Sequence, residues 1–318
     1  MNKEKIQNNI PIKKISPKSS TGRLRRVLVA LGIVTGVVIV FCIVTFFTAP
    51  FFMVNPHFDK EAHKQVLSLP DAQPVIVPIG TNPGELSGWL LDRNDEDGLI
   101  IFFGGINDTA AESICLFNDI GNDGFFINYD IAIVDWPGYG ENDGAATDDS
   151  LRLTAADVVN YFTVGNAPGD NPAESLPEGA EETATGRQNK IIVMGYSMGT
   201  GPAVYAASLC DPDALVLIAP YHSSADLYNS VVNIFHGPLK RLLSYEMNTY
   251  DYAAEVDCPS LVIAGKDDER VPFESSYKLA MLLKNCKMTE LSGISHGELL
   301  SSEPALISLA EFLAEQGK

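Results

Sequence analysis

The sequence is poor in positive charge and in cysteine. It holds 22 lysines and arginines against 41 acidic residues, which gives a formal net charge of −19 at pH 7. A surface of this sign repels phosphate groups, so we expect no nucleic-acid partner. The chain has five cysteines in 318 residues, without a Cys-x-x-Cys pair or a close cluster of His and Cys. The sequence therefore predicts neither a metal site nor a disulfide framework.

Long apolar runs are also scarce, with residues 27–47 as the exception. These 21 residues carry no charge. As an α-helix they would rise about 31 Å, which matches a bilayer core of about 30 Å. A cleaved signal peptide is the alternative, but its apolar region is usually about 7–15 residues, and Thr48-Ala49-Pro50 is a poor cleavage sequence. We predict a transmembrane helix over 27–47 that anchors the protein in a membrane.

The orientation of this helix follows from the charge on its two sides. Residues 1–26 contain eight of the lysines and arginines and a single acid, Glu4. Positive residues stay in the cytoplasm, so the N-terminus should be cytoplasmic and the remainder extracytoplasmic. We expect a basic tail over 1–26, the membrane helix over 27–47, a connector over 48–74 and a globular domain over 75–318.

Within that domain, short apolar runs alternate with helical patterns, which predicts a mostly parallel sheet flanked by helices, the α/β class. Residues 221–257 interrupt the alternation with helical pattern around 225–235 and 239–247, which indicates a small helical cap. Helices are expected over 150–164, 202–209 and 303–315. Strands are expected over 75–79, 88–91, 99–103, 131–135, 191–195, 215–219, 261–265 and, more weakly, 288–291.

A candidate nucleophile lies at the end of one strand. Residues 195–199 read Gly-Tyr-Ser-Met-Gly between an apolar run and a small-residue helical pattern, which places Ser197 on a tight strand-to-helix turn. Residues 293–297 read Gly-Ile-Ser-His-Gly, but they follow a more polar run, and no histidine lies beyond His296 to serve Ser295. Ser197 is the better candidate. A structural turn serine is the alternative.

A serine hydroxyl needs a base, and the base needs a group that orients it. The run 261–265 is followed by Asp267 and Asp268, and His296 lies in the loop after the next strand. The order Ser197, acid, His296 is the order used on the α/β-hydrolase scaffold. His222 and His236 are alternative pocket residues, for which a structural role is favoured.

Residues 75–316 resemble the α/β-hydrolase superfamily, especially the "alpha/beta hydrolase domain-containing" serine hydrolases that an N-terminal membrane helix often tethers. Residues 265–272 match the family turn G-x-x-D-x-x-V-P, which assigns the acid to Asp268. Residues 135–140 are similar to D-x-R-G-x-G, with Pro137 in place of Arg, and residues 220–223 resemble the P-F-x-S start of the cap. The resemblance implies an α/β-hydrolase fold.

One segment departs from the family pattern. Many relatives carry His-Gly-Asn after the third strand, whereas Phe103 is followed here by Gly-Gly-Ile. An oxyanion hole uses backbone N–H groups, so the missing side chains need not abolish it. The resemblance implies that the donors are the amides of Ile106 and Met198.

These features predict a membrane-anchored serine hydrolase that cleaves an acyl ester, thioester or acyl lipid through an acyl-enzyme. Ser197, His296 and Asp268 would be its triad, its partners an acyl substrate and the membrane, and neither cofactor nor metal is needed. A serine peptidase or amidase of the same fold is one alternative. A catalytically silent binding module is another, motivated by residues 103–106. Haloperoxidase-like chemistry would reuse the site, whereas a dehalogenase needs Asp in place of Ser197.

Overall fold

The computed structural model describes residues 20–48, 54–80, 84–93, 98–163, 190–231, 233–243 and 245–316. The chain divides into two compact units, Met1–Phe47 and Thr48–Lys318. Most of the tail expected over 1–26, and residues 49–53 of the connector expected over 48–74, lie outside the described residues.

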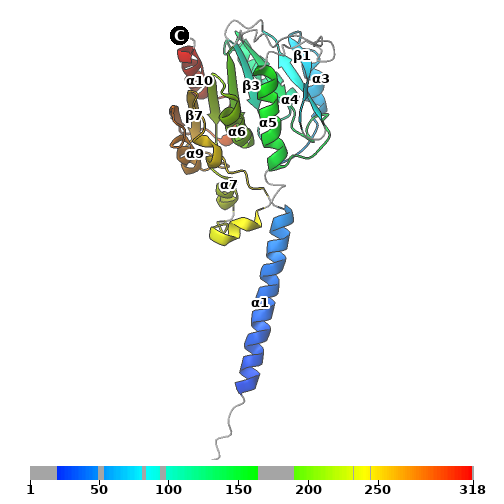
Figure 1. Cartoon of the computed structure of the whole chain (residues 1–318), viewed down its shortest axis with the longest axis vertical. Helices are drawn as coiled ribbons and strands as arrows, with labels where there is room; N and C mark the ends of the chain where they lie inside the picture. Colours follow the sequence, from blue (N-terminus) through cyan, green and yellow to red (C-terminus); the bar gives the residue numbers. More distant parts are fainter. Residues whose placement is uncertain are drawn as a thin grey trace, which may run out of the picture. The chain divides into compact units, whose positions relative to one another are not determined.

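The described part of the first unit belongs to one long helix, α1 (Ser20–Thr48), drawn in blue in Figure 1. Its segment Leu24–Thr48 has a mean hydropathy of 3.1, and its described side chains are largely exposed. This helix is long and apolar enough to cross a bilayer, although signal sequences share both properties.

The second unit contains an eight-stranded sheet in the order β1-β2-β4-β3-β5-β6-β7-β8. β2 pairs antiparallel with both β1 and β4, and every other neighbouring pair is parallel. The predicted mostly parallel α/β sheet is therefore confirmed. The strands are β1 (Ala72–Pro78), β2 (Glu85–Leu91), β3 (Gly98–Phe103), β4 (Tyr129–Val134), β5 (Ile191–Tyr196), β6 (Ala214–Ile218), β7 (Ser260–Gly265) and β8 (Cys286–Leu291).

Helices cover both faces of this sheet (Figure 1). Alternate residues of β3 show why its sequence is continuously apolar: Ile101 and Phe103 belong to one core, Ile100 and Phe102 to the other. The first core also takes the buried residues of α5 (Asp148–Thr163), α6 (Thr200–Cys210) and α9 (Phe273–Ala280). The second takes those of α3 (Lys60–Val66), α4 (Ala110–Asn122) and α10 (Glu303–Gln316).

The boundary and cap predictions need correction. β1 begins at Ala72, three residues before the expected start of the domain at 75, and α3 lies within the expected connector. The cap contains α7 (Ser224–Val231), the 3-10 helix η2 (Gly237–Leu242) and α8 (Tyr250–Ala253). Helix was expected over 239–247, but residues 245–248 are not helical.

Contacts with the start of α7 explain the non-helical segment of the cap. The hydroxyl of Ser224 donates to the carbonyl oxygen of Tyr245 at 2.9 Å, and the Ser224 amide donates to that of Met247 at 2.9 Å. Leu243, Tyr245 and Met247 are buried, whereas Glu246 is exposed. This period of two is typical of an extended segment. Tertiary hydrogen bonds therefore override the local helical pattern.

Candidate active site

The turn that carries Ser197 joins β5 to the 3-10 helix η1 (Ser197–Gly199) and then to α6. Ser197 has a φ of 51°, a left-handed conformation that a non-glycine residue adopts at a cost. A β carbon on Gly195 would lie 2.8 Å from Cβ of Ala203, and one on Gly199 would lie 2.1 Å from the Phe103 oxygen. Both glycines of the pentapeptide are thus required by close packing.

The structure brings the three predicted triad residues together. Nε2 of His296 lies 2.9 Å from Oγ of Ser197, and its Nδ1 lies 2.8 Å from Oδ2 of Asp268. Ser197 and His296 are buried, and the Asp268 side chain is only 1% exposed. All three follow the carboxyl ends of parallel strands β5, β7 and β8. This geometry suits proton transfer from the hydroxyl to the imidazole.

The two neighbouring aspartates have different partners. Oδ1 of Asp268 accepts hydrogen bonds from the amides of Arg270 and Val271, each at 2.8 Å, which leaves Oδ2 for His296. Asp267 accepts a hydrogen bond from the Gly293 amide at 2.7 Å. Asp267 therefore ties together two loops, and Asp268 is the acid that faces the imidazole.

Two residues that the sequence did not single out hold His296 in place. The Tyr196 ring stacks on the imidazole with centroids 5.3 Å apart, and its hydroxyl donates to the His296 oxygen at 2.8 Å. Burial raises the pKa of Tyr196, so this phenol stays protonated. The carboxylate of Glu269 accepts a hydrogen bond from the His296 amide at 3.1 Å. In the sequence, Tyr196 and Glu269 are marked as possible site residues only by their positions next to Ser197 and Asp268.

The competing candidates have local structural partners. Ser295 donates its hydroxyl to Glu298 at 2.5 Å in a capping box at the start of the 3-10 helix η3 (His296–Glu298). His222 lies 3.5 Å from a carboxylate oxygen of Asp226, and burial lowers the pKa of His222. His236 pairs with Asn233 at 2.6 Å.

The loop after β3 passes beside the nucleophile. A β carbon on Gly105 would lie 3.4 Å from Cβ of Ser197. The Gly105 amide donates to Oδ2 of Asp108 at 2.6 Å and is therefore engaged. The next amide along this loop is that of Ile106, the sequence-predicted donor, and Met198 follows Ser197 directly. The oxyanion assignment to Ile106 and Met198 stays a prediction.

Side chains from the β4 end hold the carbonyl groups of this loop. Nε1 of Trp136 donates to the Gly104 oxygen at 3.4 Å, and the Tyr139 hydroxyl donates to the Ile106 oxygen at 3.0 Å. Residues 104–106 and residues 135–140, the two segments in which the sequence departs from the family pattern, are therefore in contact. Burial raises the pKa of Asp108, the half-buried acid of the loop, although its bond from Gly105 opposes this.

No group of three or more His, Cys, Asp or Glu side chains in the described residues is arranged to hold a metal ion. The five cysteines are unpaired. The arrangement at Ser197 consists of a serine, an imidazole and a carboxylate on a parallel α/β sheet, which is the constellation of the α/β hydrolases.

Comparison with known proteins agrees with an α/β-hydrolase fold. A family described as "alpha/beta hydrolase fold" matches residues 98–253. The uncharacterized protein Rv2307c of Mycobacterium tuberculosis is 29% identical over 272 residues, which cover 79% of this chain and 87% of that protein. Lysophosphatidylserine lipase ABHD12 of Macaca fascicularis is 22% identical over 170 residues, 48% of this chain and 37% of that one.

Among solved structures, the Pyrococcus furiosus esterase Pf2001 superposes with a TM-score of 0.60 at 19% identity, over 83% of this chain and 98% of that one. Identity at this level shows the shared fold. The family match places residues 98–253 in the α/β-hydrolase superfamily, and the sheet observed around them has the topology of that superfamily.

Proposed function

We propose that the protein is a membrane-anchored serine hydrolase that cleaves acyl esters, thioesters or acyl lipids. The observation that carries this proposal is the continuous chain of contacts from Ser197 through His296 to Asp268, with distances of 2.9 and 2.8 Å. Membership of the superfamily supports a hydrolase, and the triad geometry supports serine as its nucleophile.

Each group has a step in the proposed reaction. Oγ of Ser197 attacks the acyl carbonyl carbon while Nε2 of His296 takes its proton. Asp268 keeps Nδ1 protonated and stabilises the imidazolium that forms. The amides of Met198 and Ile106 donate to the oxyanion. His296 then protonates the leaving group, and a water molecule, activated by the same imidazole, releases the acyl group from Ser197.

An ester or lipid substrate is favoured by three observations. One relative carries the name lysophosphatidylserine lipase, and the Pyrococcus furiosus neighbour is an esterase. The apolar helix α1 would hold the enzyme where acyl lipids are concentrated. The triad itself does not distinguish an ester from an amide, because the walls of the pocket set that preference.

A fluorophosphonate probe tests the nucleophile, because it reacts with an activated serine. The full chain in detergent micelles should label, Ser197→Ala should not, and Ser295→Ala should label like the wild type. Both variants should keep the wild-type melting temperature. Labelling that survives in Ser197→Ala overturns the assignment, and a folded wild-type chain that never labels supports the silent binding module.

A substrate panel then tests the acyl class. Matched ester, thioester and amide substrates with the same acyl group, in a series of chain lengths, should show turnover of the ester and thioester and slower turnover of the amide. The Ser197→Ala protein sets the background rate. Preference for the amide would contradict the proposed substrate class while leaving the nucleophile intact.

A further inference from the structure

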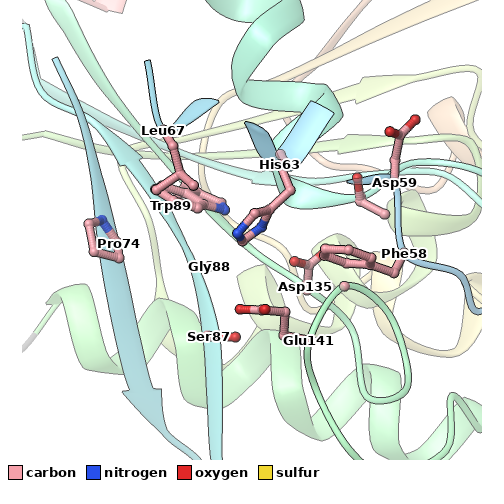
Figure 2. Close-up of a pocket in the computed structure, with 13 residues that line it drawn as sticks. Phe58, Asp59, His63, Leu67, Pro74, Ser87, Gly88, Trp89, Asp135 and Glu141 are labelled. Atoms are coloured by element: carbon pink, nitrogen blue, oxygen red, sulfur yellow. The ribbon is translucent and has the colours of Figure 1, made fainter. Parts of the chain in front are cut away.

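A cavity of about 250 Å³ opens beside β2 (Figure 2). Its walls come from the segment before α3, from α3 itself, from β1 and β2, from the start of α4 with its N-cap, and from the loop that follows β4. Its lining includes none of Ser197, Asp268 and His296. A ligand here would therefore be separate from the proposed acyl chemistry.

Three aromatic rings form one side of the cavity. The Phe58 and His63 rings have centroids 5.2 Å apart, and those of His63 and Trp89 are 5.7 Å apart. Trp89 is 7% exposed, and none of the residues that the structure describes accepts a hydrogen bond from its ring N–H. Figure 2 shows this nitrogen directed into the cavity, next to His63.

Two carboxyl groups face the same space. Asp135 is 7% exposed, and one of its oxygens accepts a hydrogen bond from the Ala110 amide at 2.7 Å. Its other oxygen has no hydrogen-bond partner within the described part of the chain. Figure 2 shows the Asp135 carboxyl group beside His63 and that of the exposed Glu141 directed toward β2 near Ser87, whereas that of Asp59 points away toward the start of α3.

We propose that this cavity binds a small organic cation of the ammonium type. Aromatic faces attract cations through their electron-rich rings, and carboxylates supply the opposite charge. No lysine or arginine is among the described residues that line the cavity, so an anionic group would face the two carboxyl groups with only the Trp89 N–H and the His63 ring as donors. An inorganic cation gains less from the ring faces than an alkylated ammonium, which matches their apolar area as well as their charge.

The ammonium group has two sources, a free amine and the headgroup of a lipid. A choline headgroup carries a phosphate beside its nitrogen. Because the described lining holds three acids and no lysine or arginine, that phosphate should weaken binding. Choline and phosphocholine are therefore the two probes that distinguish the sources.

Calorimetric titration of the full chain in detergent micelles tests the site. Choline should bind, and 3,3-dimethyl-1-butanol, which has the same shape without the charge, should bind at least tenfold more weakly. Equal binding of the two overturns the proposal. Phosphocholine that binds as tightly as choline supports the ammonium site and assigns it to a lipid headgroup; weaker binding assigns it to a free amine.

Variants locate the site. Glu141→Gln should weaken choline binding about three- to tenfold, because one of the two facing carboxylates is lost. Phe58→Leu should weaken it about two- to fivefold, since Phe58 is 45% exposed and its ring contributes modestly. Glu311→Gln is the matched control, as the same change on an exposed residue of α10. Equal affinity of Glu141→Gln and Glu311→Gln overturns the proposal.

Fluorophosphonate labelling separates this result from the proposed function. Glu141→Gln and Glu311→Gln should label like the wild type, because neither residue contacts Ser197. A loss of choline binding with labelling intact is expected. Labelling failure in every variant, wild type included, would count against the hydrolase and leave the ammonium site to be judged from the titration alone.

Discussion

The α carbon of Gly199 packs against the carbonyl oxygen of Phe103, where a β carbon would lie 2.1 Å away. This contact joins the turn that carries Ser197 to the end of β3, from which the predicted oxyanion loop begins. The Phe103 oxygen belongs to the central strand of the sheet and cannot yield as a flexible side chain would. The relative position of nucleophile and loop is thus set by backbone packing.

Gly199→Ala should therefore damage the site. We expect the fluorophosphonate reaction to slow strongly and the free energy of unfolding to fall by about 1–3 kcal/mol, as overpacking does. Labelling kinetics and the melting temperature are the measurements. Gly297→Ala is the control, because it is the corresponding glycine of the second pentapeptide and a β carbon there meets nothing within 4 Å. Similar behaviour of the two variants would contradict the packing argument.

The acid is tested by comparing neighbours. Asp268→Asn should reduce kcat by up to about 10⁴-fold, because an amide at this position favours the wrong imidazole tautomer. Asp267→Asn should have a mild effect, since Asp267 contacts the Gly293 amide and not the imidazole. Ester turnover of both purified variants checks this. The reverse ranking would assign the acid to Asp267.

Stability should depend on pH through Asp135. Burial raises the pKa of Asp135 from 3.8 to about 6. The folded state then binds this proton more tightly than the unfolded state. The contribution of Asp135 to the free energy of unfolding is therefore fully present below about pH 3.8 and is lost as the pH rises through about 6. The difference corresponds to about 3 kcal/mol.

Asp135→Asn removes this contribution while keeping an oxygen that accepts from the Ala110 amide. The melting temperature of Asp135→Asn minus that of the wild type should therefore increase between pH 4 and pH 6. Glu311→Gln, on an exposed residue, should follow the wild type. Parallel pH profiles for wild type and Asp135→Asn would show that Asp135 is not the group responsible.

Topology decides which substrates the proposed site meets. The eight cations before residue 27 should keep the N-terminus in the cytoplasm, which places Ser197 outside it. Protease added to intact cells should remove the catalytic domain while a cytoplasmic marker survives. Protection until the membrane is permeabilised would reverse the orientation. A soluble product that begins near Pro50 would identify residues 27–47 as a cleaved signal.

Much of the fold could be predicted because its signals are local. The strands of the parallel sheet read as continuous apolar runs, since both of their faces are buried. The helices α4 and α9 were not predicted. The start of α4 is marked by the capping box between Thr109 and Glu112, a signal that sequence inspection can use. Of the helix expected over 239–247, only the part up to Leu242 is helical, within η2, because Ser224 binds the carbonyl groups of Tyr245 and Met247.

The sequence by itself determined the α/β class and the order of Ser197, Asp268 and His296, because strand periodicity and turn motifs are carried by neighbouring residues. Only the tertiary structure decided how these groups are held. Tyr196 and His296 are 100 residues apart in the chain, and Asn55 reaches Asn107 on the loop beside Ser197. The cavity of Phe58, Trp89 and Asp135 likewise draws on distant segments. Such contacts depend on how layers pack, for which no local pattern exists.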